Sequence, residues 1–172
     1  MKKAVAFGVL LVLIGGGLFV PWIQVFSFEE TRTNEPTKYY LKMSRDQQFK
    51  MVFTHSIHLT DVVESYEVLE DRRIKFLSMQ YSDLAIGMPG YAEDGQTLIY
   101  EDGLYTLMYD NKTIREFNLY IGAVDYDLKF HYEARRYNLK NNLQKGHSYQ
   151  ISIKRISIFD YLKGEKLHDE KG

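Results

Sequence analysis

The feature of this sequence that most constrains its fold is the alternation of apolar and polar side chains from residue 38 onward. In "DLKFHYEA", Leu128, Phe130 and Tyr132 alternate with polar residues, and "SYQISIKR" repeats the pattern. A period of two places alternate side chains on opposite faces of a strand, with one face wet, as in antiparallel sheets. The chain has fourteen tyrosines and ten phenylalanines, which favour the same structure because aromatic side chains pack well on a pleated surface.

The alternation predicts a series of strands joined by tight turns. The expected strands span residues 38–44, 49–56, 62–70, 74–82, 97–100, 104–109, 113–121, 126–132 and 148–159. Asp102-Gly103 and Asn111-Lys112 each lie between two alternating runs, which is typical of a hairpin, and "LEDRRI" is a third candidate turn. Successive hairpins at this spacing indicate a mainly β fold, either an antiparallel β-sandwich or a small barrel. Residues 135–147 are the least strand-like and predict a loop or a short helix.

Residues 4–23 form an uncharged, apolar run that follows Lys2 and Lys3. A helix of this length spans roughly 30 Å, the thickness of the hydrocarbon core of a bilayer. Lysines before the run, with no basic cluster just after it, orient the amino terminus toward the cytoplasm. We therefore expect one N-terminal transmembrane helix, within residues 1–24, that places the rest of the chain outside the cytoplasm. The alternative is a signal sequence that is cleaved to release the protein.

The remaining chain divides into three parts by composition. Residues 25–37 are polar and predict a tether, residues 38–162 a β-rich extracytoplasmic domain, and residues 163–172 a charged tail. The absence of cysteine excludes disulfides, thiolate metal sites and cysteine acylation. The formal net charge of −1, with lysine and arginine scattered along the chain, argues against nucleic acid as a partner.

A group of polar residues lies where the second predicted strand ends: His55 and Ser56, followed by Thr60 and Glu64. If residues 56–61 form a turn, the next strand returns and brings Glu64 near His55, where a hydrogen bond or ion pair would fix the hairpin. The same residues could instead bind a ligand or partner, or form a hydrolase site that uses His55 and Glu64. Neighbouring residues on a strand point to opposite faces, so His55 is poorly placed to activate Ser56.

Histidine and carboxylate residues also recur at a spacing of three: His55, His58, Asp61 and Glu64. On a helix this spacing would line one face and suit a metal ion. The segment is predicted to be strand, turn and strand, which breaks the alignment, so we predict no metal or other cofactor. The other histidines are expected to be solvated, on wet faces or in loops: His131, His147 and His168.

The segment "SDLAIGMPGYAEDGQ", residues 82–96, contains Gly87, Met88 and Pro89 in a glycine-rich stretch. It predicts a connection between strands or a loop that contacts a ligand or partner, because binding residues gather on loops held by a rigid sheet. The lysine and hydroxyl residue of a phosphate-binding loop are missing after its glycines.

Two stretches, "THSIHLTDVVESYEV" and "YSDLAIGMPG", resemble the domain-of-unknown-function family numbered 1850. The matching positions include His55, Ser56, Ile57, Thr60, Glu64, Tyr66, Gly87, Met88 and Pro89. His58 stands where the family has glutamate, and Asp61 where it has proline. The resemblance covers residues 49–159. It implies a small exported bacterial or archaeal protein, often encoded beside TRAP-type transporters that use TAXI-class solute-binding proteins, with no established enzymatic activity.

We therefore expect a membrane-anchored, extracytoplasmic and non-enzymatic accessory domain whose partner is a transporter permease or a solute-binding protein. The expected contact surface combines the polar group at His55 with the loop at residues 87–90. The alternative is an envelope protein that binds or senses a small ligand, and a hydrolase is the least expected function.

Overall fold

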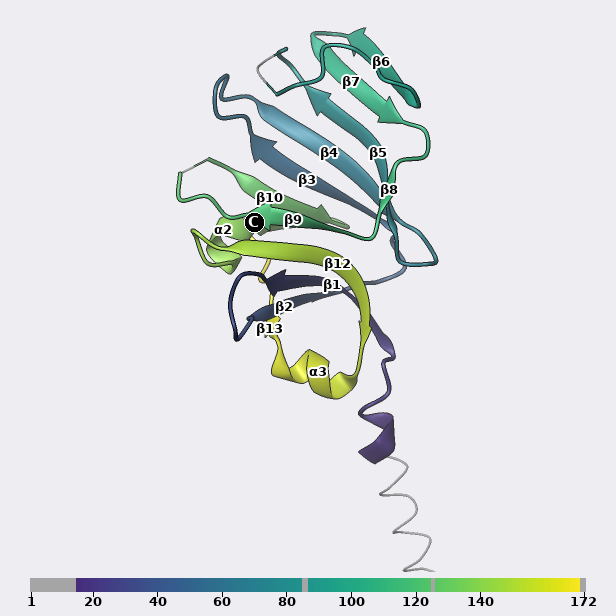
Figure 1. Cartoon of the computed structure of the whole chain (residues 1–172), viewed down its shortest axis with the longest axis vertical. Helices are drawn as coiled ribbons and strands as arrows, with labels where there is room; N and C mark the ends of the chain where they lie inside the picture. The colour runs from purple at the N-terminus through teal and green to yellow at the C-terminus, as the bar shows by residue number, and fades with distance from the viewer. Residues whose placement is uncertain (1–14, 85–86, 125, 171–172) are drawn as a thin grey trace, which may run out of the picture.

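The computed structural model describes residues 15–84, 87–124 and 126–170. Two sheets pack face to face in an open sandwich (Figure 1). The smaller sheet has the order β13 (Glu165–Lys166), β2 (Lys38–Lys42), β1 (Ile23–Glu30), β12 (Ser148–Ile156) and β9 (Glu116–Tyr120). The larger has the order β11 (Arg135–Asn138), β10 (Leu128–Tyr132), β3 (Gln48–Thr54), β4 (Asp61–Val68), β5 (Ile74–Tyr81), β7 (Leu104–Tyr109) and β6 (Gln96–Glu101), with β8 (Thr113–Ile114) paired to β5. The predicted antiparallel, mainly β fold is confirmed, and only β13 pairs in parallel among these strands.

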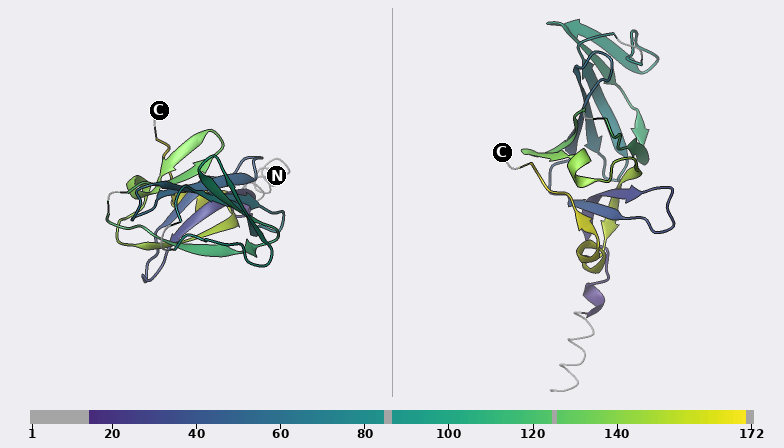
Figure 2. Two further views of the ribbon diagram at one scale, coloured as in Figure 1. Left: turned by 90° about the horizontal axis from the view of Figure 1, so that it is seen from above. Right: turned by 90° about the vertical axis from the view of Figure 1, so that its left-hand side faces the viewer.

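The core lies between β1 and β12 on one side and β3, β4 and β10 on the other. Phe26 of β1 packs edge to face against Phe49 and Phe130, with ring centroids 5.1 and 5.0 Å apart. Phe49 in turn stacks on Tyr66 at 4.9 Å. The larger sheet continues past this core: Figure 1 shows β5, β7 and β6 beyond the edge of the smaller sheet, and the side view of Figure 2 shows the resulting elongated shape.

The predicted tether at residues 25–37 is wrong, because it begins inside a central strand. β1 pairs with β2 on one side and β12 on the other, and Val25, Phe26 and Phe28 are fully buried. Phe26 and Phe28 face the larger sheet, whereas Val25 packs on the opposite face with Tyr40 and Ile156. A strand that is buried on both faces shows no alternation, which is why the period-two pattern missed it.

The hairpin predictions have mixed outcomes. Asp102-Gly103 joins β6 and β7 with both residues at positive φ, 50° and 80°, as a tight hairpin turn requires. The predicted turn in "LEDRRI" joins β4 and β5. The hairpin at Asn111-Lys112 is wrong: β8 pairs with β5, and β9 pairs with β12 in the other sheet. This segment therefore carries the chain from one sheet to the other.

The C-terminal part is more ordered than a charged tail. β12 ends at Ile156, and α3 (Ile158–Lys163) follows, with the Ser157 side chain accepting a hydrogen bond from the Asp160 amide as its N-cap. The chain then pairs with β2 through β13. Beyond it, the His168 amide donates to the Asn142 side-chain oxygen at 2.6 Å.

The segment 135–147 contains β11 and a short helix, α2 (Leu139–Asn142), so the expected helix is present and the strand was missed. Asn138 caps α2 by accepting from the amides of Lys140 and Asn141. At the other end of the chain, residues 1–14 of the predicted transmembrane segment lie outside the described residues. Within the described ranges, no helix is long and apolar enough to cross a bilayer.

Candidate functional site

A cleft of about 520 Å³ opens between the two sheets, where β9 forms the edge of the smaller one. Its walls come from the inner face of β3, β4 and β5, from β9, and from the loop that leads to β10. The residues that line it are Met51, Phe53, Thr54, Glu64, Tyr66, Phe76, Phe117, Asn118, Leu119, Tyr120, Gly122, Val124, Tyr126, Asp127, Leu128 and Lys140.

The alternation of two neighbouring strands builds one wall of this cleft. On β3, Met51 and Phe53 face inward, and on β4 so do Glu64 and Tyr66. The register places Glu64 directly opposite Met51 on one side and Met79 of β5 on the other. A carboxyl group therefore stands in a row of thioether side chains on the inward face of the sheet.

Aromatic rings flank this carboxyl group. Tyr66 packs edge to face on Phe76, with centroids 5.0 Å apart, and stacks on Phe117 of β9 at 5.9 Å. Because Phe117 belongs to the opposite sheet, the aromatic wall bridges both layers of the sandwich. At the rim the cleft becomes polar: the Lys129 ammonium pairs with the Asp127 carboxylate at 2.8 Å, and Lys140 donates to the Val124 carbonyl.

Glu64 is a partly buried acid of the cleft. Burial raises the pKa of the Glu64 carboxyl group above its usual range, although the Tyr66 hydroxyl and the charge of Lys112 pull in the opposite direction. The Tyr66 hydroxyl donates to Glu64 Oε2 at 2.6 Å. Burial and the neighbouring carboxylate in turn raise the pKa of Tyr66, so the phenol stays a proton donor at neutral pH. A carboxyl group whose pKa is raised by burial often marks a functional site.

A lysine side chain of the protein lies over the aromatic rings near Glu64, and its charge acts on the Glu64 carboxyl group. The Lys112 ammonium stands 4.5 Å from the ring centroid of Phe76 and 5.0 Å from that of Tyr109. Phe76 also lines the cleft on the side of Glu64. The same rings and carboxyl group thus attract positive charge within the protein itself.

The predicted contact between His55 and Glu64 does not form. His55 lies just past the end of β3, in the turn that joins β3 to β4: its amide donates to the Thr60 carbonyl at 2.8 Å, and its carbonyl accepts from Leu59 at 2.9 Å. Glu64 pairs with Met51 of β3. Because Met51 precedes His55 by four residues, Glu64 and His55 are about 13 Å apart along the strands. The turn itself was predicted correctly, but backbone hydrogen bonds close it, rather than a contact between the side chains of His55 and Glu64.

The remaining predicted site residues lie apart from the cleft. Ser56 is exposed in the turn, and Thr60 contributes its carbonyl group to it. Met88 packs on the cluster formed by Val62, Tyr81 and Leu107, and the Tyr81 hydroxyl donates to the Pro89 carbonyl.

The loop that contains Gly87 therefore lies against the larger sheet where it extends past the smaller one, near β5 and β7. Of the predicted site residues, only Glu64 is among those that line the cleft. Within the described part of the chain, no three His, Asp or Glu side chains are placed to hold a metal ion.

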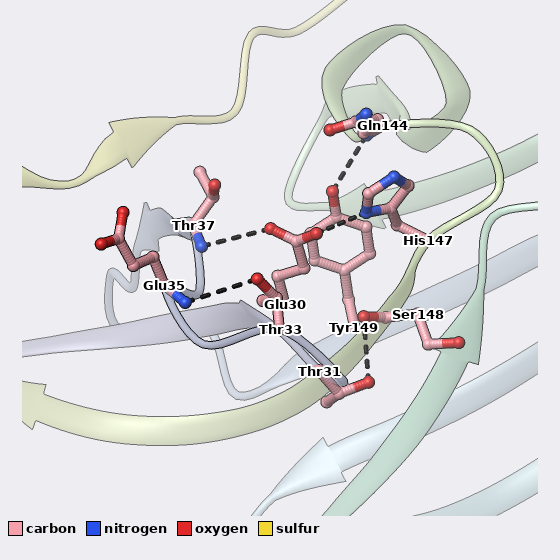
Figure 3. A network of polar contacts seen from close by, with 9 residues as sticks. All are labelled: Glu30, Thr31, Thr33, Glu35, Thr37, Gln144, His147, Ser148 and Tyr149. Carbon is pink, nitrogen blue, oxygen red and sulfur yellow. Dashed lines mark hydrogen bonds and ion pairs between the residues drawn. The ribbon is translucent and has the colours of Figure 1, made fainter.

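A second polar group was missed by the sequence analysis (Figure 3). His147, expected to be solvated, contacts the Glu30 carboxylate through Nδ1. Glu30 is 9% exposed at the end of β1 and also accepts from the Thr37 amide at 3.3 Å. Nearby, the Gln144 amide donates to the Tyr149 hydroxyl at 3.0 Å. These contacts tie the β1–β2 loop to the start of β12, and sequence spacing gave no signal for them because 117 residues separate Glu30 from His147.

The fold and the cleft together define an open β-sandwich with an aromatic cleft between its sheets that contains the partly buried Glu64. The chain belongs to the family described as Domain of unknown function (DUF1850), whose model matches residues 49–139, just over half of the chain. This confirms the resemblance noted in the sequence. The matched segment contains every residue that lines the cleft except Lys140. The comparison with curated proteins gives no match, and neither does the comparison with solved structures.

Proposed function

We propose that this protein is a non-enzymatic binding module whose inter-sheet cleft takes a small molecule with an apolar body and a positively charged head. The observation that carries the proposal is Glu64, a partly buried carboxyl group with a raised pKa that lines the cleft with aromatic side chains. A ligand cation beside it would supply the counter-charge that burial denies the carboxylate.

The dimensions of the cleft support a small ligand. Its volume of about 520 Å³ falls within the roughly 300–1,000 Å³ of ligand sites in proteins, which combine apolar walls with a few placed polar groups. Phe53, Phe76 and Phe117 supply the apolar walls, and the Glu64–Tyr66 pair supplies the polar floor.

The electrostatics favour a cation over an anion. An ammonium group over an aromatic face gains roughly 0.5–2 kcal/mol, more when water is excluded. Lys112 makes this contact with Phe76 and Tyr109. A ligand carboxylate would instead meet the like charge of Glu64. Binding of a cation should lower the pKa of Glu64, so the complex should release protons at pH values where the free carboxyl group is partly protonated.

The test is calorimetric titration with benzyltrimethylammonium and, as a neutral probe of similar apolar body, benzyl alcohol. We expect the cation to bind more tightly than the alcohol, and Glu64→Gln to weaken cation binding by about tenfold, or roughly 1.4 kcal/mol. Glu101→Gln, which removes a charge from the exposed end of β6, should leave binding unchanged. Equal binding of the two probes, or equal effects of the two substitutions, would contradict the proposal.

We further propose that this binding serves a solute transporter, with the chain anchored to the membrane by its N-terminal segment and facing outward. The uncharged run at residues 4–23 supports the anchor, and the transporter is what the resemblance noted in the sequence implies. The partner would be a transporter permease or its solute-binding protein. Purification of the tagged full chain from mild detergent should recover a transporter subunit; recovery of none, with solute uptake unaltered by deletion of the gene, would refute this role.

The alternative is an envelope sensor that binds the same ligand without a transporter. Binding of the cation in the calorimetric test would support both functions, and the purification from detergent distinguishes them. A hydrolase that uses His55 and Glu64 is disfavoured by the distance of about 13 Å along the strands between these residues.

A further inference from the structure

One end of the molecule carries a cluster of exposed apolar side chains. The base patch, as we call it, consists of Leu18, Phe19, Val20 and Trp22 before β1, and Phe159 and Leu162 on α3. Trp22 is 69% exposed and Leu162 is 74% exposed. Large apolar groups gathered in this way on a surface mark a contact with a partner or a membrane.

Direct contacts join the two halves of the base patch. The Phe159 amide donates to the Leu18 carbonyl at 3.2 Å, and the rings of Phe19 and Phe159 lie 5.2 Å apart. The Trp22 indole nitrogen donates to the Gly17 carbonyl at 3.2 Å. Figure 1 shows α3 and the start of the described chain at the same end of the molecule, opposite β6 and β7. Segments more than 130 residues apart in sequence thus form one surface.

The opposite face of α3 fixes it to the sandwich. Tyr161 packs on the cluster of Val25, Tyr40 and Ile156, on the outer face of the smaller sheet, while Phe159 and Leu162 point away from it and are exposed. Lys163 is exposed at the end of the helix, and a lysine next to apolar residues can extend its ammonium group toward lipid phosphates.

The sequence before the base patch indicates which kind of surface it would meet. Residues 4–14, which precede the described part, read "AVAFGVLLVLI", and this uncharged run continues without interruption into Leu18 and Trp22. β1 begins at Ile23, so no slack remains between the apolar run and the first strand. If the run enters a bilayer, the domain is held against the surface of that bilayer.

We propose that the base patch is a lipid-contacting surface and that α3 lies at the boundary of headgroups and acyl chains. Aromatic side chains such as Trp22 and Phe159 favour this boundary, and short apolar faces can bury there beside an anchor. The domain is then attached to the membrane at two places, the N-terminal segment and α3. Its long axis would point away from the bilayer, with β6 and β7 farthest from the lipid. This inference rests on the N-terminal anchor proposed above and is independent of the ligand proposed for the cleft.

The absence of cysteine in the chain allows a direct test with single spin labels. The full chain is placed in vesicles of phosphatidylcholine and phosphatidylglycerol, with labels at Leu162→Cys or, as the control at the far end, Tyr100→Cys, which replaces a residue that is 61% exposed. We expect the label at 162 to be reached by oxygen and shielded from a water-soluble nickel complex, and the label at 100 to show the reverse.

Two results of the spin-label experiment would overturn the proposal. One is equal access of the nickel complex to both labels, which would leave α3 in water. The other is strong coupling between labels at 162 on two copies, which would mean that a second chain covers the base patch.

Trp22, the single tryptophan, gives a second measurement: brominated lipid should quench its fluorescence, and Leu162→Glu should reduce that quenching. Quenching that is absent, or unaltered by Leu162→Glu, would also refute the lipid contact.

Discussion

At the scale of single residues, the chemistry of this protein depends on the surroundings of two glutamates. Glu64 lies on the inward face of β4, where burial disfavours its charged form. Glu30 lies at the end of β1, where the contact with His147 and the Thr37 amide favours the charged form. The pKa of Glu64 is raised and that of Glu30 is lowered, so the two carboxyl groups have opposite effects on stability as pH changes.

We predict that Glu64→Gln stabilises the protein at neutral and alkaline pH. With its raised pKa, the folded state binds more protons than the unfolded state at pH values above the ordinary glutamate pKa of about 4.3. The free energy of unfolding of the wild type should therefore fall as pH rises from there through the raised pKa, and the glutamine variant should lack this slope. Urea unfolding across this pH range measures the difference. A variant that is less stable than the wild type at pH 8 would contradict the prediction.

His147→Ala should destabilise the fold by about 1 kcal/mol at neutral pH, since it removes one hydrogen-bond partner from the buried Glu30 carboxylate. The lowered pKa of Glu30 means that this stability is present above the ordinary glutamate pKa and is lost as pH falls through the lowered value. The difference between variant and wild type should accordingly shrink in acid. His168→Ala, near the C-terminal end, is the control. A difference independent of pH would exclude the contact with the Glu30 carboxylate as its source.

At the scale of elements, period-two alternation located most of the strands that have one wet face, but it missed β11 and the central strand β1, which is buried on both faces. The strands β3, β4, β5, β6 and β7 lie within about two residues of their predicted bounds. β1 is buried on both faces because Tyr161 of α3 packs on the outer face of the smaller sheet. The role of "VFSF" therefore depends on a helix more than 120 residues away, which no local pattern encodes.

The end of α3 provides a sharp test of this packing. A Cβ atom at Gly164 would lie 2.6 Å from Tyr40 Cδ2 and 3.2 Å from the Lys38 carbonyl oxygen. We expect Gly164→Ala to cost about 1–3 kcal/mol of unfolding free energy, because the ring or the strand must shift. Gly90→Ala is the matched control, since a Cβ atom there meets nothing within 4 Å. Thermal denaturation of both variants measures the effect, and equal melting temperatures would show that α3 does not pack on β2 in this way.

At the scale of the whole molecule, the sandwich depends on a strand that sequence reasoning placed outside the domain. β1 is central in the smaller sheet and supplies Phe26 and Phe28 to the core. A chain that starts at Lys38 should therefore fail to unfold cooperatively and should expose its apolar core. A chain that starts at Pro21 keeps β1 and should fold. Calorimetry and binding of a hydrophobic dye distinguish the two, and a cooperative transition in the shorter chain would refute the central role of β1.

The sequence alone determined the class of fold, most of the strand positions and the family, because alternation, turn residues and a short motif are local signals. It also singled out Glu64, although for a contact with His55 that the register does not allow. Only the tertiary structure decided the division into two sheets, the path through residues 110–116, and the presence of Glu64 and Phe117 in the same cleft. Each of these depends on pairing between distant strands, and the free energy of such pairing is set by packing in three dimensions rather than by the neighbours of a residue along the chain.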